Sequence, residues 1–340
     1  MKKSILFAFL FIMGAFVVAC GSTSSVTSNE EGSADTNTET TDEVAEFTPE
    51  GPIKYIVGFA PGGGTDLAAR SAARTLNEEG IVEESFAVEN ITGGGGVRAL
   101  MELRNKGDEN TLLQSVDIYA GMYMPDANMR LDDFIPVAQI ANNTLLMVVP
   151  SDSEYQTVDE LMNAMKDDSK QIFIGLPSAT DTVEVAKWNE IAESYGIESE
   201  LRFIPHNGIS EVVPELLGGR IDVALFVPPV IKGYLDSDEL NALATLSTER
   251  LEVLPEIPTL VEQGSDVYFY RPQGVFMKAG ISEEAVSYWE NALKEMTMTD
   301  SWKEYIESQL YIDEFKGRDE YTEWMDTEGR RYSEFLNSQN

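Results

Sequence analysis

Short apolar segments alternate with helical patterns along most of this 340-residue chain, and this alternation constrains the fold more than any other feature. A helix between two strands lets both strands run in the same direction, so the pattern indicates an α/β fold with parallel or mostly parallel sheets. The length suits two such sheets better than one. The expected strand segments are 53–59, 86–90, 111–116, 136–140, 144–150, 171–177, 200–205, 220–226 and 240–247.

Apolar residues at helical spacing predict the intervening helices. Ala69, Ala72, Ala73 and Leu76 fall on one helical face, and Gly80 suits the end of that helix. From Ser282, a plausible N-cap, the chain is mainly helical and rich in aromatic residues. Further helices are expected at 97–107, at about 158–165, through Trp188, Ile191, Ala192 and Tyr195, at 211–219, and at 317–337.

The first residues predict export. Lys2 and Lys3 precede an apolar run, Ile5–Ala19, that is too short to span a bilayer comfortably. The run ends in Val-Val-Ala-Cys, which resembles the lipobox of bacterial lipoproteins, with lipidation on Cys20, the only cysteine. We therefore expect a lipoprotein signal peptide over 1–19 and a protein held outside the cytoplasm on the bacterial cell membrane.

Residues 20–51 are rich in Ser, Thr, Asp and Glu and nearly empty of large apolar residues, so we expect a disordered acidic tether. The whole chain carries 59 acidic and 24 basic residues, a formal net charge of −35. This charge makes nucleic acid an unlikely partner. It indicates a solvated acidic surface and makes an anionic ligand harder to attract.

A glycine-rich junction follows the first expected strand. Gly62, Gly63 and Gly64 lie between that strand and a helix that opens with Thr65 and Asp66. Glycines let backbone amides turn inward, and a helix start offers free N–H groups to an anion. The junction lacks the endings of a P-loop and of a dinucleotide fingerprint. The alternative is a simple turn in which Thr65 or Asp66 caps its own helix.

Two more junctions between a strand and a helix are rich in small residues. Gly93–Gly96 precede a helix that contains Arg98, and a flexible loop is the alternative interpretation there. Ser178–Thr182 lie between a later strand and helix. Two helix starts that face each other across a cleft would hold a carboxylate from both sides, because local amides outweigh a distant, screened negative field.

Catalytic patterns are poorly represented. His206 is the only histidine, which excludes a multi-histidine metal site, and no serine lies in a G-x-S-x-G elbow. Asp66, Asp181 and Asp222 could form an acid/base pair, but their spacing selects no dyad. We expect no enzyme, no metal and no cofactor.

Four segments in this order resemble the receptors of tripartite tricarboxylate transporters, the TctC or Bug family. The segments are VGFAPGGGTDLAAR, VENITGGGG, LLGGRIDVALF and LPEIPTLVEQG. The resemblance spans 53 to about 335 and implies a type II periplasmic-binding-protein fold, two α/β domains with the ligand between them. It implies crossovers near Leu145–Pro150 and Ala244–Glu249, and hence domain 1 over 52–147 and 247–340 and domain 2 over 148–246.

The resemblance also implies the ligand contacts. The loops Phe59–Asp66 and Ser178–Thr182 would hold a ligand carboxylate through backbone amides, hydroxyls and bridging waters, with further residues lining the cleft. The full set of candidates is Phe59, Ala60, Gly62, Gly63, Gly64, Thr65, Asp66, Ser115, Ser178, Ala179, Thr180, Asp181, Thr182, His206, Asp222 and Phe226.

Three positions depart from the family pattern. Asp181-Thr182 stand where Ser-Thr is usual, His206-Asn207 replace Tyr-Lys, and Arg271-Pro272-Gln273 precede Gly274 where an aromatic is usual. An aspartate at an anion site would cap its own helix or meet a ligand amine. Our hypothesis is a ligand other than a simple di- or tricarboxylate, one that carries an amine or a single carboxylate.

Together these features predict a monomeric solute-binding lipoprotein that captures a small carboxylated metabolite and delivers it to the membrane subunits of a tripartite tricarboxylate-type transporter. One alternative is a receptor of the same kind that reports to a membrane signalling partner. An enzyme on the same scaffold is a third.

Overall fold

The computed structural model describes residues 47–116, 118, 129–167, 169–177, 182–206 and 209–338. The predicted signal peptide, Cys20 and nearly all of the predicted tether lie outside these residues. No helix in the described ranges is long and apolar enough to cross a membrane.

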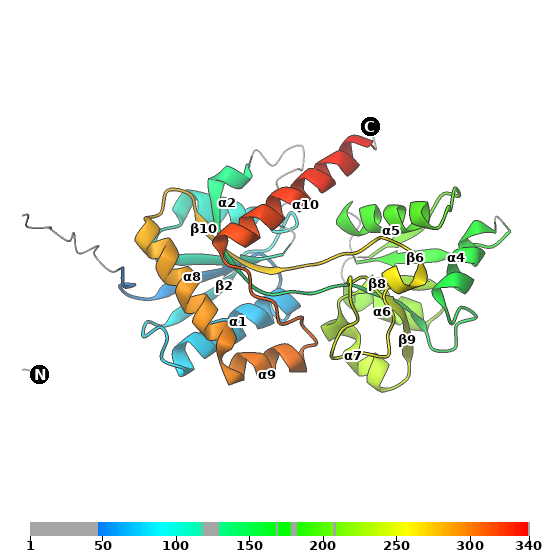
Figure 1. Ribbon diagram of the computed structural model, residues 1–340, viewed down its shortest axis with the longest axis horizontal. Helices are drawn as coiled ribbons and strands as arrows, with labels where there is room; N and C mark the ends of the chain where they lie inside the picture. The colour runs from blue at the N-terminus through cyan, green and yellow to red at the C-terminus, as the bar shows by residue number, and fades with distance from the viewer. Residues whose placement is uncertain are drawn as a thin grey trace, which may run out of the picture. The chain divides into compact units, whose positions relative to one another are not determined.

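The first sheet, which contains the strands labelled β2 and β10 in Figure 1, has the strand order β2-β1-β3-β10-β4. Its strands are β1 (Ile53–Val57), β2 (Phe86–Asn90), β3 (Thr111–Ser115), β4 (Phe134–Ala141) and β10 (Gln273–Lys278). β1 is parallel to β2 and β3, whereas β10 is antiparallel to both of its neighbours. β10, the last strand of this sheet in the sequence, therefore lies between β3 and β4. It begins at the end of the sheet where β1 and β3 finish.

The second sheet has the order β7-β6-β8-β5-β9. Its strands are β5 (Leu146–Pro150), β6 (Phe173–Leu176), β7 (Arg202–Pro205), β8 (Val223–Phe226) and β9 (Leu240–Thr245). β6 is parallel to β7 and β8, and β5 is antiparallel to β8 and β9. All nine expected strand segments contain a strand.

The prediction of parallel or mostly parallel sheets is only partly right, because four of the eight pairs between the described strands are antiparallel. The cause lies in the two connections between the sheets. No helix separates β4 from β5, and β10 enters the first sheet from the second one. The strand β10 itself, over Gln273–Lys278, was not among the predicted strands.

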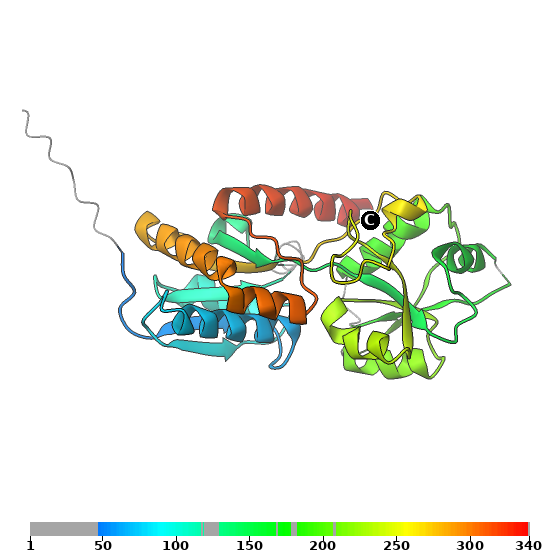
Figure 2. The same ribbon diagram turned by 60° about the horizontal axis from the view of Figure 1, so that its bottom comes forward.

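The helices of the first sheet cover both of its faces. α1 (Gly64–Glu78), α8 (Glu283–Met298) and α9 (Asp300–Ser308) share one apolar core with the sheet, including Ala69, Ala72, Leu76 and Trp289. α2 (Val97–Lys106) and α10 (Arg318–Ser338) contribute to the core on the other face. Figure 2 shows α10, in red, and α1, in blue, on opposite sides of this sheet.

The second sheet is covered in the same way. α6 (Ile209–Leu217) and α7 (Pro228–Asp236) pack around Leu146, Val148 and Phe226. α4 (Val158–Lys166) and α5 (Thr182–Ser194) pack on the opposite side, where Trp188 and Ile191 are fully buried as their helical spacing predicts. Two short 3₁₀ helices, η1 (Leu131–Asp133) and η2 (Val261–Gln263), complete the described elements.

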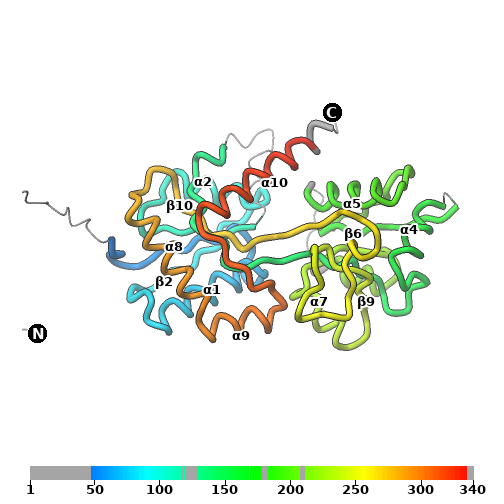
Figure 3. The backbone as a smooth tube through the Cα atoms, viewed as in Figure 1, coloured from blue at the N-terminus to red at the C-terminus, as the bar shows by residue number. Residues whose placement is uncertain are grey.

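Two crossovers join the sheets, and they are hydrogen-bonded to each other (Figure 3). Asn143 donates its N–H to the Arg271 carbonyl at 3.1 Å, and Arg271 returns an N–H to the Asn143 carbonyl at 2.6 Å. Leu246 donates to the Leu145 carbonyl at 2.8 Å. The chain thus leaves the first sheet after Ala141 and returns to it at Gln273, a pattern typical of a two-domain α/β binding protein.

Candidate functional site

The glycine-rich junction connects β1 to α1 at the carboxyl end of β1, the edge where open α/β sheets bind ligands. Ala60, Gly62, Gly63 and Gly64 are exposed, and Phe59 is half-buried. Gly63 is the N-cap residue, and no side chain caps α1. The alternative in which Thr65 or Asp66 caps its own helix is therefore not observed. The first N–H groups of α1 stay available to an anion.

The Asp66 carboxylate is turned into the loop that precedes it. It is buried, and its Oδ2 accepts the Gly62 N–H at 2.8 Å. Arg70 Nε donates to both oxygens, and Asn90 Nδ2 donates to Oδ1 at 2.8 Å and to the Phe59 carbonyl at 3.0 Å. Burial alone would raise the pKa of Asp66, but these hydrogen bonds outweigh it and lower the pKa. Asp66 is thus an ionised residue that shapes the loop.

The second glycine loop lies against the first. Gly93, Gly94, Gly95 and Gly96 all have positive φ angles, between 60° and 125°, a conformation that side chains with a Cβ rarely adopt. Gly96 is the N-cap residue of α2, which also has no side-chain cap. A Cβ at Gly96 would lie 4.0 Å from the Phe59 ring, so the N-cap of α2 lies beside the residue that opens the first loop.

Ser115 lies at the end of β3 beneath both loops. A Cβ at Gly58 would lie 3.4 Å from Ser115 Oγ, and one at Gly96 would lie 3.5 Å from it. Ser115 is only 2% exposed, and its hydroxyl donates to the Val116 carbonyl at 3.3 Å. Ser115 thus lies beneath the end of β1 and the second glycine loop, and its role in lining the cleft stays a prediction.

A buried chain of polar side chains crosses the first sheet toward the same edge. Tyr55 donates its hydroxyl to Gln114 Oε1 at 2.7 Å, and Gln114 donates Nε2 to Gln273 Oε1 at 3.0 Å. Gln273 begins β10, and the next residue, Gly274, pairs with Ser115. Sequence reasoning missed this chain, because residues 114 and 273 come together only through the antiparallel pairing of β3 with β10.

Tyr311 supports the start of α1 from below. Its hydroxyl donates to the Gly64 carbonyl at 3.3 Å, and burial raises the pKa of Tyr311 to about 12. The residue comes from the segment between α9 and α10, far from the loop in sequence. Tyr311 belongs to no periodic pattern in the sequence, so its contact with Gly64 could not be predicted from the sequence.

The third junction is described only at its borders. Ser178, Ala179, Thr180 and Asp181 lie outside the described residues, and Thr182 begins α5. His206 is half-buried next to the end of β6. Its backbone N–H donates to the Leu176 carbonyl at 3.0 Å, and its ring Nδ1 lies 3.2 Å from the same oxygen. His206 therefore lies at the end of β6, beside the third junction.

Asp222 and Phe226 do not join this group. Asp222 lies before β8, where its carboxylate accepts the Phe173 N–H at 2.7 Å and burial raises its pKa. At about 3.3 Å per residue, that is roughly 13 Å from Phe226 at the far end of the strand. Phe226 is at the correct end but is 1% exposed, and it packs in the apolar core with Leu146.

Charged side chains gather where α5, α10 and the returning crossover meet. Lys187 Nζ lies 3.0 Å from Glu190 Oε2, and Arg331 of α10 lies 2.7 Å from the same oxygen. Arg271 Nη1 is 4.0 Å from Glu184, which is 2% exposed. Burial lowers the pKa of Lys187, the most buried cation of the cluster. These ion pairs fix α5, which follows directly on the third junction.

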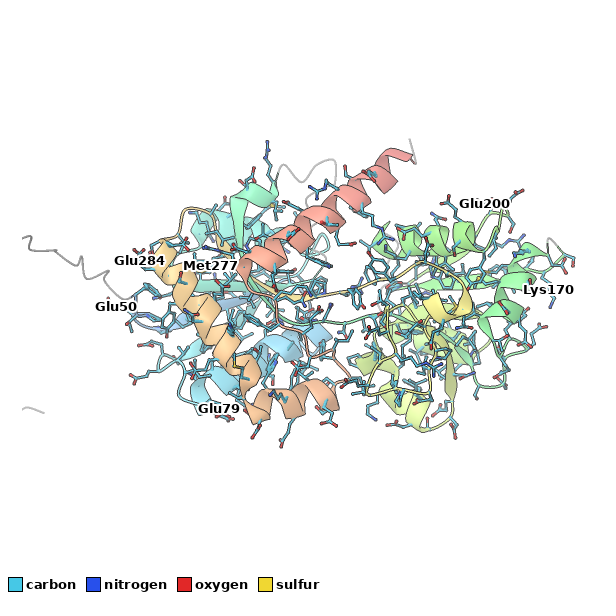
Figure 4. The ribbon with its side chains drawn as sticks, in the orientation of Figure 1. Glu50, Glu79, Lys170, Glu200, Met277 and Glu284 are labelled. Atoms are coloured by element: carbon cyan, nitrogen blue, oxygen red, sulfur yellow. The ribbon has the colours of Figure 1, made fainter. Side chains whose placement is uncertain are left out.

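Many other acidic side chains of the described residues lie scattered over the surface. Glu50, Glu79, Glu200 and Glu284 come from different parts of the chain and are all exposed (Figure 4). Within the described residues, no group of three or more His, Cys, Asp or Glu side chains is arranged to hold a metal ion.

Comparison with known proteins identifies relatives of this architecture. A "UPF0065 protein in gbd 5'region" of Cupriavidus necator is 27% identical over 280 residues, which cover 78% of this chain and 84% of the relative. Two solved structures from Rhodopseudomonas palustris share the fold. MatC with bound malate has a TM-score of 0.71 at 19% identity, covering 85% of this chain and 99% of MatC. A second protein, with adipate, has a TM-score of 0.75 at 21% identity, covering 85% and 97%.

The family model described as "Tripartite tricarboxylate transporter family receptor" matches residues 68–325, which is most of the folded chain. This match agrees with the two mixed sheets, the paired crossovers and the glycine loops at the strand ends. The fold is the type II periplasmic-binding-protein fold with two α/β domains. The chain belongs to the tripartite tricarboxylate transporter receptors, a family of extracytoplasmic solute-binding proteins.

Proposed function

We propose that this receptor captures a small carboxylated solute and delivers it to the membrane subunits of its transporter. The observation that carries the proposal is the uncapped start of α1 on an exposed glycine loop whose one acid, Asp66, is turned into the loop. Such a start offers N–H donors and the positive end of a helix dipole to a carboxylate. Bound malate and adipate in two proteins of the same fold support this ligand class.

The third junction, Ser178–Thr182, would hold the ligand from the second domain, with His206 beside it. Because Asp181 brings a negative charge to that junction, we propose a ligand other than a simple di- or tricarboxylate, one that carries an amine or only a single carboxylate. An Asp181→Ser variant should then shift the preference toward dicarboxylates. If the variant prefers the same ligands as the wild-type protein, the hypothesis is wrong.

Several features of the chain are part of the same proposal. Cys20 would carry the lipid anchor, residues 20–51 would form the tether, and the protein would act as a monomer without catalysing a reaction. The domain boundaries would lie in the crossovers, after Ala141 and before Gln273, instead of at 147/148 and 246/247, because all of β5 pairs in the second sheet and Thr259 pairs with Thr245 of β9. Mass spectrometry of the membrane-extracted protein would test the lipid on Cys20, which should be lost in a Cys20→Ala variant.

The test of the ligand class is a thermal-shift and calorimetric screen of Ala45–Asn340, which forms a compact unit. Short carboxylic acids, amino acids and neutral solutes are compared, because a ligand that binds only the folded protein raises its melting temperature. We expect binding by carboxylates, weakened about tenfold by Thr65→Val, the loss expected for a hydrogen bond to a charged group. Thr75→Val is the matched control, a buried threonine at the far end of the same helix. Binding of neutral solutes alone would overturn the proposal.

A further inference from the structure

We propose that the side-chain amide of Gln273 donates a hydrogen bond to the bound ligand and that Tyr55 and Gln114 fix its orientation. The inference rests on the proposed function, because it concerns the same site. It adds to the backbone amides of α1 a side-chain donor that comes from the other end of the chain.

The orientation follows from the direction of the hydrogen bonds. The Tyr55 hydroxyl donates to Gln114 Oε1, which leaves Gln114 Nε2 to donate to Gln273 Oε1. With its oxygen engaged, Gln273 has only its NH₂ group to offer. A tyrosine hydroxyl can serve as donor or acceptor, but burial raises the pKa of Tyr55, so the donor proton stays in place.

The position follows from the strand pairing. Gln114 pairs with Val57, the last residue before the glycine junction, and the Gly58 N–H donates to the Gln114 carbonyl at 3.4 Å. Gln273 begins β10 at the same edge. Tyr55 belongs to the core that also holds Tyr311, whose hydroxyl bonds to Gly64. The chain of side chains therefore ends beneath the start of α1, on the side of the sheet that α1 covers.

Gln273 is only 2% exposed, and its side-chain oxygen accepts the Gln114 amide. Its Nε2 is not among the fully buried side-chain atoms without a partner, so this donor reaches the surface at the junction. Tyr55 and Gln114 are both fully buried. A ligand oxygen at the junction would pair this donor. An NH₂ group whose own amide oxygen is occupied favours a carboxylate, a charged acceptor, over the weaker neutral carbonyl of a primary amide.

The experiment compares Gln273→Glu with the wild-type protein. Glutamate keeps the size of the side chain and an oxygen for Gln114, but it replaces the donor with an acceptor. Binding is measured by calorimetry with malate, adipate and other short carboxylates, and with the primary amides made from the same acids. We expect the affinity for carboxylates to fall at least about tenfold, because a hydrogen bond to a charged group is lost. The affinity for the amides should fall less, because an amide can donate to glutamate.

Gln139→Leu is the matched control. Gln139 is fully buried in the neighbouring strand of the same sheet, but its amide donates to Glu314. This variant should lower the melting temperature and leave the ratio of carboxylate to amide affinity unchanged. Tyr55→Phe, which frees Gln114 to turn over, should lower that ratio by a smaller factor than Gln273→Glu.

The outcomes separate the two proposals. If the wild-type protein binds no carboxylate, the proposed function fails. If it binds carboxylates and Gln273→Glu leaves the ratio of carboxylate to amide affinity unchanged, only the role of Gln273 is overturned. An equal loss of affinity for both kinds of ligand would also overturn it, because that result indicates a structural role.

Discussion

Asp66 Oδ2 lies 2.8 Å from the Gly62 amide nitrogen, so the one acid in the glycine loop is hydrogen-bonded to the loop itself. The negative charge that would repel an anionic ligand is paired with Arg70, four residues later on the same helix. An acidic protein thereby keeps the start of α1 positive. The same contact ties Gly62 to the first turn of the helix.

Replacing Asp66 with alanine should therefore lower both stability and carboxylate affinity. The variant loses the hydrogen bonds that a buried, ionised acceptor receives from the Gly62 N–H, Arg70 and Asn90, which costs about 2 kcal/mol in the free energy of unfolding. Urea unfolding at neutral pH measures this loss.

The contribution of Asp66 should depend on pH in a defined direction. Because folding lowers its pKa, its stabilisation is fully present above the ordinary aspartate pKa of about 4 and is lost as the pH falls through the lowered value. The stability difference between the wild-type protein and Asp66→Ala should therefore shrink on acidification below about pH 4. A difference that stays constant there would contradict an ionised Asp66.

Gly96→Ala should weaken ligand binding more than its effect on stability explains. At a φ of 95°, an alanine costs roughly 1–3 kcal/mol, and its Cβ would lie 3.5 Å from Ser115 Oγ, next to the glycine loop. Gly264→Ala is the control, because Gly264 has a φ of 92° and open space around it. Similar melting temperatures with unequal affinities are expected, and equal affinities would place Gly96 outside the site.

Glu190→Gln should destabilise the protein more than Lys187→Met. The Lys187 side chain is 6% exposed, and Glu190 is its acceptor at 3.0 Å. Glutamine keeps an acceptor oxygen but removes the negative charge, so the buried cation loses its counter-ion at a cost of about 3 kcal/mol, whereas replacing the cation with an apolar side chain of similar length costs less. Asp236→Asn breaks the exposed pair with Lys232 and should cost under about 1 kcal/mol. The reverse order of the first two variants in urea unfolding would show that the pair is not desolvated.

Added salt should raise the melting temperature of the folded unit. With a formal net charge of −35 on the chain, repulsion between surface carboxylates opposes folding, and roughly 0.5 M KCl reduces the screening length well below about 8 Å. Differential scanning calorimetry in low and high KCl measures the effect. Sucrose, which stabilises proteins without screening charge, separates screening from solute exclusion. An unchanged melting temperature in KCl would contradict the role of repulsion.

Local patterns predicted the elements of this fold well. Apolar periodicity located α1 and the strand before it, and Ser282 is the N-cap of α8, where its hydroxyl accepts the Ala285 N–H. The glycine junction was also recognisable, because its glycines and the first residues of the helix are adjacent in the sequence.

Long-range pairing could not be predicted in this way. The antiparallel entry of β10 brings Gln273 to Gln114, which is 159 residues earlier in the sequence. Asp222 was chosen with Phe226 because both belong to one motif, yet they lie at opposite ends of one strand and only the end of Phe226 faces the third junction. A sequence motif can thus predict that a strand lies near the site, but it does not predict which end of that strand faces the ligand.

The paired crossovers have a mechanical consequence. Asn143 and Arg271 exchange two backbone hydrogen bonds, so the connections form a ribbon of two strands instead of two separate tethers. A ribbon of this kind bends readily about one axis in its plane, but shear would break its hydrogen bonds. We therefore expect any opening between the two sheets to be a bend about this ribbon, which would keep the glycine junction and the third junction in the same register whenever the sheets close.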